Sequence, residues 1–393
     1  MQPRDHSSIL SRLGIAIRQR IVVLVLIAIP IPFWPAWWCG READSFFVGD
    51  SFETFAPLVA EAAHSLQSDS GAGHSPTGDW QYDGEWNLVT WQMNGIGLCQ
   101  LIDRFPDRKS RLAPLVELSI DRLLEPKTRA FDTRRWNEDA LEGLSGTRGH
   151  LAFLGYANAL LSFWRKIEPH NRFAEINDRI SEALLQRFRS SPLGLIETYP
   201  QEVYPVDNTP ALASLALWRK ATGQKANPLL PGLVRRLREQ YRDAVSGLLY
   251  QSVLAGNGMP ADKPRVSGTA LAAYFLSFVD PALSRELYGS LKACRKELAG
   301  FTAFLEYPAN VAPGDGDVDS GPVVFGLSVS GTGFSLASAR IHHDREVFRG
   351  VYRQLYLFGM PYDSGGRRNF LMGGPLGNAL ALALLTAEKD GGI

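Results

Sequence analysis

The stretch GHLAFLGYANALLSFW, residues 149–164, decides the fold, because it is apolar nearly all round and rich in small side chains. A helix with this pattern is covered on all sides by other parts of the protein. Five more segments share the design, each an apolar run after a polar loop that contains Gly or Pro: 85–102, 208–218, 267–278, 321–339 and 375–386. Equivalent positions in the six segments lie about 52 to 61 residues apart, a period that suits a pair of helices with their loops.

Amphipathic segments with many charges alternate with the apolar ones: 51–66, 110–124, 172–189, 229–242, 281–298 and 345–358. Their apolar residues recur at three- and four-residue steps, which gives each helix one buried stripe. Six inner and six outer helices predict an all-α fold, an (α/α)6 toroid or barrel of six helical hairpins; an open helical array is the alternative. Weak strand patterns at 198–206 and 247–254 allow short hairpins at loop ends.

The bulk composition is that of a globular protein. The chain has 393 residues, 45% hydrophobic and 21% charged, so it can bury a sizeable core. Its 41 basic residues balance its 41 acidic ones, which argues against a nucleic-acid partner. The three cysteines form no C-x-x-C pair and signal no metal site. Cys99 and Cys294 could form one disulfide outside the cytosol, but buried free thiols are the favoured alternative.

The N-terminus carries an uncharged run, 21–39, preceded by four arginines. Nineteen apolar residues just span a bilayer, and the arginines would stay on the cytoplasmic side. We therefore expect a basic cytoplasmic segment at 1–20, a transmembrane or signal-anchor helix at 21–39, and an extracytoplasmic barrel domain at 45–393. The prolines within the run favour the alternative of a cleaved signal peptide and a secreted protein.

Polar and aromatic residues gather in the loops before the inner helices, which converge near the axis of such a ring. The loop at 78–86 contains Asp79, Asp83 and Glu85, and the loop at 136–150 ends at His150. Further candidates lie in the loop at 197–208 and before the fourth and fifth inner helices: Glu197, Tyr199, Tyr204, Asp207, Asn208, Arg265 and Asp319. A carboxylate before a helix is often an N-cap, so a structural role is the alternative for each aspartate.

Four stretches, 148–161, 191–223, 263–288 and 317–340, resemble the bacterial linalool dehydratase/isomerase family. The resemblance implies an (α/α)6 barrel that removes water from a small terpene alcohol, or isomerises it, without a cofactor. The family's active-site histidine falls on His150 and a family tyrosine on Thr269. Its two catalytic cysteines fall on Asp207 and near Glu197, so the thiols are not retained.

These residues lead to one main functional hypothesis. A lyase or isomerase would use His150, Asp207 and Glu197 for acid–base catalysis on a small hydrophobic, terpenoid-like alcohol. The remaining candidates would bind that substrate: Asp79, Asp83, Tyr199, Tyr204, Asn208, Arg265, Thr269 and Asp319. We expect no metal and no cofactor, contact with a membrane through the N-terminal segment, and leave a homo-oligomer open.

Two other classes of function stay open. Helical toroids also host glycoside-cleaving enzymes, and Asp83 or Glu85 with Asp207 could form the carboxyl pair of an inverting glycoside hydrolase. A non-catalytic binding protein is the third alternative, since fold alone does not fix function.

Overall fold

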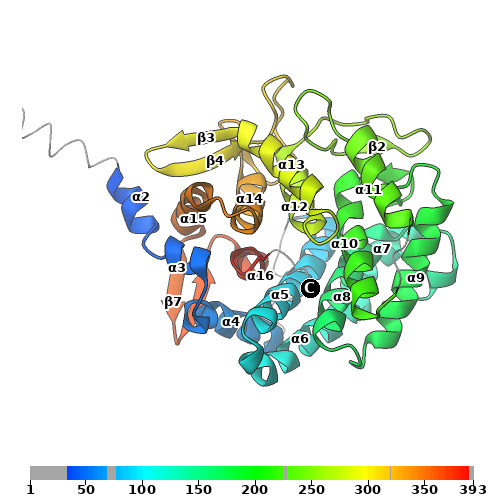
Figure 1. Ribbon diagram of the computed structural model, residues 1–393, viewed down its shortest axis with the longest axis horizontal. Coiled ribbons are helices and arrows are strands. Elements are labelled where there is room, and N and C mark those ends of the chain that lie inside the picture. The colour runs from blue at the N-terminus through cyan, green and yellow to red at the C-terminus, as the bar shows by residue number, and fades with distance from the viewer. Residues whose placement is uncertain (1–32, 69–76, 225–227, 319, 389–393) are drawn as a thin grey trace, which may run out of the picture.

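The computed structural model describes residues 33–68, 77–224, 228–318 and 320–388. Within these ranges the protein is mostly helical and has an α/α architecture, with an inner ring of helices covered by an outer layer (Figure 1). The prediction of a mostly helical α/α fold is therefore confirmed.

The inner helices correspond to the six apolar segments. Each packs on the next in the order α5, α8, α10, α12, α14, α16, and α16 returns to α5. Their bounds are Trp80–Arg104, Leu151–Ile167, Pro205–Ala221, Val266–Leu276, Val329–Ile341 and Gly374–Leu385. Among the described residues the inner helices thus close into a ring, which leaves no unpaired apolar end.

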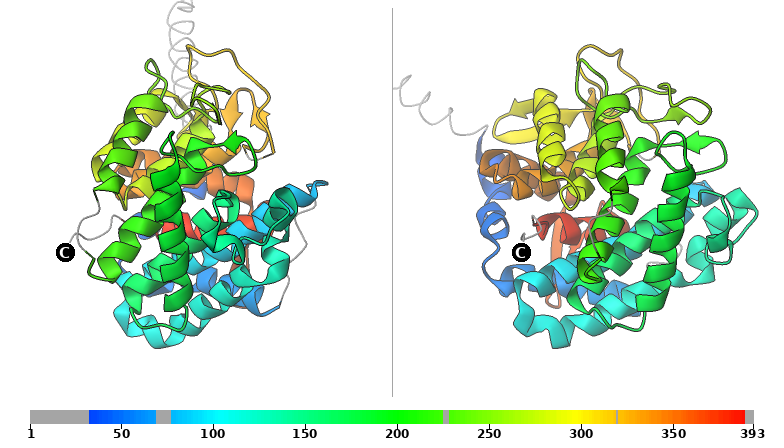
Figure 2. Two further views of the ribbon diagram at one scale, coloured as in Figure 1. Left: turned by 90° about the vertical axis from the view of Figure 1, so that its right-hand side faces the viewer. Right: turned by 45° about the vertical axis from the view of Figure 1, so that its right-hand side comes forward.

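The outer helices pair with the inner ones along the chain. They are α4 (Phe52–Gln67), α6 (Lys109–Leu124), α9 (Ala174–Ser190), α11 (Leu229–Gln240), α13 (Pro281–Ala293) and α15 (Arg345–Gly359), and the turned views show them covering the ring from the side (Figure 2). A further helix, α7 (Pro126–Trp136), lies in the long loop before α8. The amphipathic patterns in the sequence predicted these outer elements.

Short strands lie in the loops of the helical body, and they form more sheets than the two weak strand patterns in the sequence indicated. β1 (Glu202–Val203) pairs with β2 (Val253–Leu254), which joins the two weak strand patterns to each other. A four-stranded sheet has the order β3, β4, β6, β5, and β7 and β8 form a hairpin. The bounds are Arg295–Leu298, Phe301–Leu305, Leu327–Ser328, Val323–Val324, Pro361–Ser364 and Arg367–Phe370, in that order.

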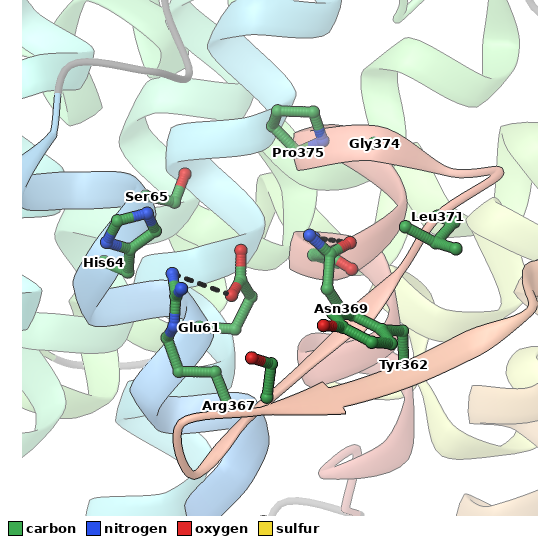
Figure 3. Close-up of a pocket in the computed structure, with 11 residues that line it drawn as sticks. Glu61, His64, Ser65, Tyr362, Arg367, Asn369, Leu371, Gly374 and Pro375 are labelled. Atoms are coloured by element: carbon green, nitrogen blue, oxygen red, sulfur yellow. Dashed lines mark hydrogen bonds and ion pairs between the residues drawn. The ribbon is translucent and has the colours of Figure 1, made fainter.

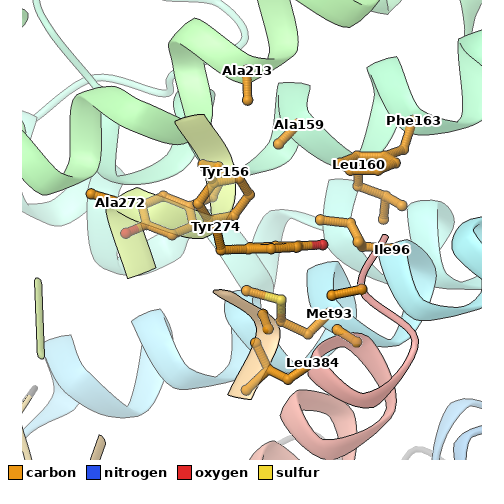
Figure 4. Close-up of a cluster of buried hydrophobic side chains, with 14 of the residues drawn as sticks. Met93, Ile96, Tyr156, Ala159, Leu160, Phe163, Ala213, Ala272, Tyr274 and Leu384 are labelled. Atoms are coloured by element: carbon orange, nitrogen blue, oxygen red, sulfur yellow. The ribbon is translucent and has the colours of Figure 1, made fainter. Parts of the chain in front are cut away.

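The middle of the ring is filled with apolar side chains. Met93, Ile96, Tyr156, Tyr274 and Leu384 come from four different inner helices and meet there (Figure 4). Small residues let the helices approach closely: a Cβ atom on Gly95 would overlap the Leu160 side chain. The ring is therefore a packed core, and a ligand must approach one of its ends.

The predicted membrane segment, 21–39, falls mainly on residues outside the described ranges. Its last part forms the short helix α2 (Trp34–Cys39), which packs beside α15 with Ala36 and Cys39 buried. No helix in the described ranges is both long and apolar enough to cross a membrane. Cys39, Cys99 and Cys294 are free, buried thiols, so the Cys99–Cys294 disulfide is not formed.

Candidate functional site

The inner helices run in the same direction, so the loops that precede them meet at one end of the ring. On α5, Gly97 faces Leu382 of α16, and three residues later Gln100 donates a hydrogen bond of 2.9 Å to Thr386. Between α8 and α10, Gly155 lies beside Ala211, and three residues later Asn158 donates a hydrogen bond of 2.9 Å to Ser214, so these two helices are also parallel. The N-terminal end of the ring therefore collects the polar loops that the sequence singled out.

Glu85 lies in the second turn of α5 and points to the inside of the ring. It precedes Val89, Met93 and Ile96 at steps of three and four residues, and the last two line the core in Figure 4. Its carboxyl group accepts hydrogen bonds from Tyr199 Oη and, at 2.9 Å, from Gln81 Nε2. Burial is the main cause that raises the pKa of Glu85 to about 7, although its side chain stays partly exposed.

Asp207 occupies the first turn of α10, which begins at Pro205. Its two carboxyl oxygens accept hydrogen bonds from Tyr156 Oη at 2.8 Å and from Thr198 Oγ1 at 3.0 Å. Burial raises the pKa of Asp207 to about 6, and these two hydrogen bonds oppose the rise. Like Glu85, the residue is only partly buried.

Glu85 and Asp207 belong to one site. Adjacent residues bridge them, because Thr198 bonds to Asp207 and Tyr199 bonds to Glu85. The negative charge of Asp207 also contributes to the raised pKa of Glu85. The pKa of Tyr199 lies well above its ordinary value because of burial and the nearby carboxylates, so its hydroxyl remains a donor at neutral pH. Two carboxyl groups that share a half-buried site are poised to exchange protons at neutral pH.

Arg135 of α7 forms the wall beside this carboxyl pair. Its guanidinium group lies 4.4 Å from the centre of the Tyr199 ring, donates a hydrogen bond of 2.6 Å to Gln81 Oε1, and pairs with Glu202. Tyr204 Oη donates to the other oxygen of Glu202 at 3.2 Å. Arg135 thereby holds both donors to Glu85, namely Gln81 and Tyr199, in place.

His150 lies in a separate, enclosed cluster. The side chain is 0% exposed, and its ring nitrogens lie 2.6 Å from Asp132 Oδ2 and 3.2 Å from Glu138 Oε2. The Trp136 ring covers the imidazole at a centroid distance of 5.0 Å. The backbone of His150 has φ of 49°, which places it in the left-handed region just before α8. Both nitrogens are therefore engaged with protein atoms.

Other predicted residues hold the loops together. Asn208 is buried and clamps residue Ile196, accepting from its N–H at 2.8 Å and donating to its C=O at 3.2 Å. Thr269 accepts from the Leu249 N–H at 3.0 Å. The backbone carbonyl of Glu197 accepts from the Leu151 N–H at 3.4 Å, which ties the third loop to the start of α8.

The remaining predicted residues lie around the rim. Asp79 caps α5 by accepting from Gln81 N at 2.8 Å, and Asp83 accepts from the backbone and side chain of Thr77. Arg265 pairs with two carboxylates, Asp262 and Asp317. Asp319 lies outside the described residues.

Sequence reasoning missed several contributors to the carboxyl site. Tyr156 lies inside an apolar helix, where a tyrosine is indistinguishable from a core residue until its hydroxyl partner is known. Gln81 lies in the segment 78–86, which was expected to be a loop, and Arg135 lies just before the loop at 136–150, where no helix was expected. The one available signal was the spacing of four residues between Gln81 and Glu85, which places both on one face of a helix.

Comparisons with known proteins identify the fold. No protein-family model matches the chain, and no curated protein matches it by sequence. Several solved structures match the fold of the chain. An alpha-1,6-mannanase of a Salegentibacter species, in complex with alpha-1,6-mannotetrose, covers 86% of this chain and 98% of its own, with 14% identity and a TM-score of 0.52.

Two more similar structures are also glycoside hydrolases. A family 105 glycoside hydrolase from C. acetobutylicum covers 85% of this chain and 98% of its own, at 11% identity and a TM-score of 0.54. The unsaturated glucuronyl hydrolase from a Bacillus species covers 86% of this chain and 98% of its own, at 13% identity and a TM-score of 0.50. The chain thus has the α/α fold found in these glycoside hydrolases.

These structures correct the main functional hypothesis. The resemblance to linalool dehydratase/isomerase was wrong, because the folds similar to this one belong to glycoside hydrolases. A terpenoid-like alcohol is therefore no longer the expected substrate, since the similar mannanase structure holds an oligosaccharide. The alternative of a carbohydrate-active α/α enzyme agrees better with the fold.

Proposed function

We propose that this protein is a carbohydrate-active enzyme that hydrolyses a glycosidic bond at Glu85 and Asp207. The observation that carries the proposal is the pair of partly exposed carboxyl groups, both with raised pKa values, at the N-terminal end of the inner ring. Hydrolysis of a glycoside uses two such groups, one as an acid and one as a base or nucleophile. The glycoside hydrolases of similar fold support the same class of reaction.

The pKa values suggest how the two roles are divided. Glu85, with a pKa of about 7, keeps its proton for a large part of the time at neutral pH and can donate it to the glycosidic oxygen. Asp207, with a pKa of about 6, is mostly ionised at the same pH and can take a proton from the attacking water. The C–O bond to the leaving sugar breaks as the new bond to the water oxygen forms.

The surroundings suit a sugar ring. Trp80, at the start of α5, is 41% exposed and lies five residues before Glu85. An exposed indole face can stack on the apolar face of a sugar, and Arg134 covers one side of this ring at 4.0 Å. Arg135 and Glu202 beside the carboxyl pair supply further hydrogen-bonding groups.

The proposal is tested by a hydrolysis screen. The wild-type protein is incubated with alpha-1,6-mannan oligosaccharides, unsaturated glycosaminoglycan disaccharides and a panel of neutral oligosaccharides, and products are identified by mass spectrometry. We expect cleavage of at least one substrate class, with loss of activity in Asp207→Asn and Glu85→Gln.

Asp103→Asn is the matched control, because Asp103 lies on the same helix as Glu85 at its far end and pairs with Lys166 on the surface. It should leave turnover unchanged. Cleavage that survives in both site variants, or no cleavage of any substrate by the wild type, would contradict the proposal.

A further inference from the structure

A hollow lies at the edge of the ring, between α4, the β7–β8 hairpin and the start of α16 (Figure 3). Its volume is about 360 Å³, within the range of small-molecule pockets. The polar residues that line it come from all three elements: Glu61, His64, Tyr362, Arg367, Asn369 and Asn378.

One wall of this hollow carries an ion pair of opposite charges. Glu61 is buried and pairs with Arg367 at 3.6 Å, and His64 lies one turn further along α4. Burial raises the pKa of Glu61, while Arg367 and His64 oppose the rise. Because the guanidinium already faces a carboxylate, the wall lacks the surplus positive charge that a phosphate or sulfate would need.

The opposite wall presents oriented amides. Asn378 donates from Nδ2 to Asn369 Oδ1 at 3.0 Å and accepts from the Phe370 N–H at 2.7 Å, which fixes both side chains. The rim is apolar: Tyr362 is 53% exposed and Leu371 is 56% exposed. A mixture of donors, acceptors and an exposed aromatic ring matches a sugar residue, whose hydroxyls both donate and accept and whose ring has an apolar face.

The hollow lies at the same end of the ring as the carboxyl pair. Gly97 of α5 faces Leu382 of α16. At 1.5 Å per residue, Glu85 lies about 18 Å before that level on α5, and Gly374 about 12 Å before it on α16. The two are thus separated by only about 6 Å along the axis, while neighbouring inner helices stand about 8–10 Å apart. The start of α16, which forms one wall of the hollow, therefore lies at nearly the same level of the ring as Glu85.

We propose that this hollow binds a neutral sugar residue of an oligosaccharide whose scissile bond lies at Glu85 and Asp207. The inference rests on the proposed function and adds to it that the substrate is a chain of several sugars. Binding energy from the distal residue would then help to hold the scissile bond in place.

Titration calorimetry of the Asp207→Asn protein tests this inference. The probes are alpha-1,6-mannotetraose, cellotetraose, xylotetraose and maltotetraose. Two further changes are added in turn: Tyr362→Ala removes the exposed ring, and Asn369→Asp keeps the acceptor for Asn378 but removes the amide donor. We expect at least one tetrasaccharide to bind, with its Kd raised tenfold or more by each change.

Leu298→Ala is the control, because Leu298 is highly exposed at the end of β3, outside this hollow, and the change should leave the Kd unaltered. Failure of all four probes to bind, or a Kd that neither pocket change alters, overturns the inference. If the wild type hydrolyses an oligosaccharide but neither pocket change alters the Kd, this inference is overturned and the proposed function stands. Pocket-dependent binding without any hydrolysis overturns the proposed function and leaves the binding site standing.

Discussion

Two carboxylate clusters lie at the N-terminal end of the inner ring, and their environments differ in one decisive way. Around His150, Asp132 and Glu138 meet both nitrogens of an imidazole that is completely enclosed. Around Glu85 and Asp207, neutral hydroxyl groups supply most of the hydrogen bonds, and both carboxyl groups keep some exposed surface. The first arrangement suits an anchor that fixes the loop before α8, whereas the second leaves protons available to a ligand.

The His150 cluster and the Glu85–Asp207 pair show that residue type alone is a poor guide to chemistry. A histidine is the usual general base near neutral pH, but here the imidazole of His150 is enclosed and both of its nitrogens contact carboxylates. Carboxyl groups reach the same pH range when they are desolvated beside neutral partners, as with Glu85 at about 7 and Asp207 at about 6. The catalytic role that the sequence suggested for His150 stays a prediction, which the following experiments separate from that of the carboxyl pair.

The largest expected effect is on catalysis. Each of Glu85→Gln and Asp207→Asn should lower kcat by about 10²–10⁴-fold, the usual contribution of a positioned acid or base. Both variants keep the size of the side chain, so the fold should persist. Steady-state rates on the substrate found in the hydrolysis screen give the measurement, with circular dichroism to verify folding. A loss smaller than tenfold would place the acid–base chemistry elsewhere.

Changes in the His150 cluster should lower the stability of the protein and leave its catalysis unchanged. His150→Ala leaves Asp132 buried without its partner, so we expect the free energy of unfolding to fall by about 3–5 kcal/mol. Urea unfolding of wild type and variant measures this change. The folded fraction of the variant should keep the wild-type pH profile of kcat/KM. A profile that changes shape while stability stays the same would instead make His150 a catalytic residue.

The raised pKa of Glu85 predicts a pH-dependent cost of folding. Its folded pKa of about 7 exceeds the ordinary value of 4.5, so ionisation favours the unfolded state as pH rises between these values. The Glu85→Gln protein should therefore gain stability relative to wild type across this window, by up to about 3 kcal/mol above pH 7. Below about pH 4 the difference should vanish. Thermal unfolding at a series of pH values checks the trend, and a gap that is independent of pH would refute it.

The smallest effect concerns Tyr199. Its hydroxyl donates to Glu85 and lowers the pKa of that carboxyl group, so Tyr199→Phe should raise the pKa further. If Glu85 is the acid, activity falls as pH rises through its pKa, and the alkaline limb of the profile should move upward by a fraction of a pH unit. A downward shift would show that Tyr199 acts on another group.

The sequence predicted the scaffold better than the site. The alternation of apolar and amphipathic segments, at a spacing of about 52 to 61 residues, is a repeated local pattern, and such patterns report burial directly. The β3–β6 sheet escaped notice because strands of two to five residues give almost no periodic signal. Asp207 and Glu85 were both considered, but their connection through Thr198 and Tyr199 depends on how the start of α5 meets the loop before α10.

The functional class was misjudged for a related reason. The stretches that resembled linalool dehydratase/isomerase include inner helices rich in Ala, Leu and Gly, such as 148–161, whose composition is set by close packing in a ring. Such a likeness reports the architecture that the proteins share. Reactive groups, in contrast, are few and lie near the starts of the inner helices, so they leave little trace in the pattern.

The pH profile of kcat/KM on a cleaved oligosaccharide tests whether Glu85 and Asp207 are the acid–base pair. We expect a bell-shaped curve with limbs near about 6, from Asp207, and about 7, from Glu85. Residual activity of Glu85→Gln should lose the alkaline limb, and that of Asp207→Asn the acidic one. Limbs that persist unchanged in both variants would contradict the assignment of Glu85 and Asp207 as the acid–base pair.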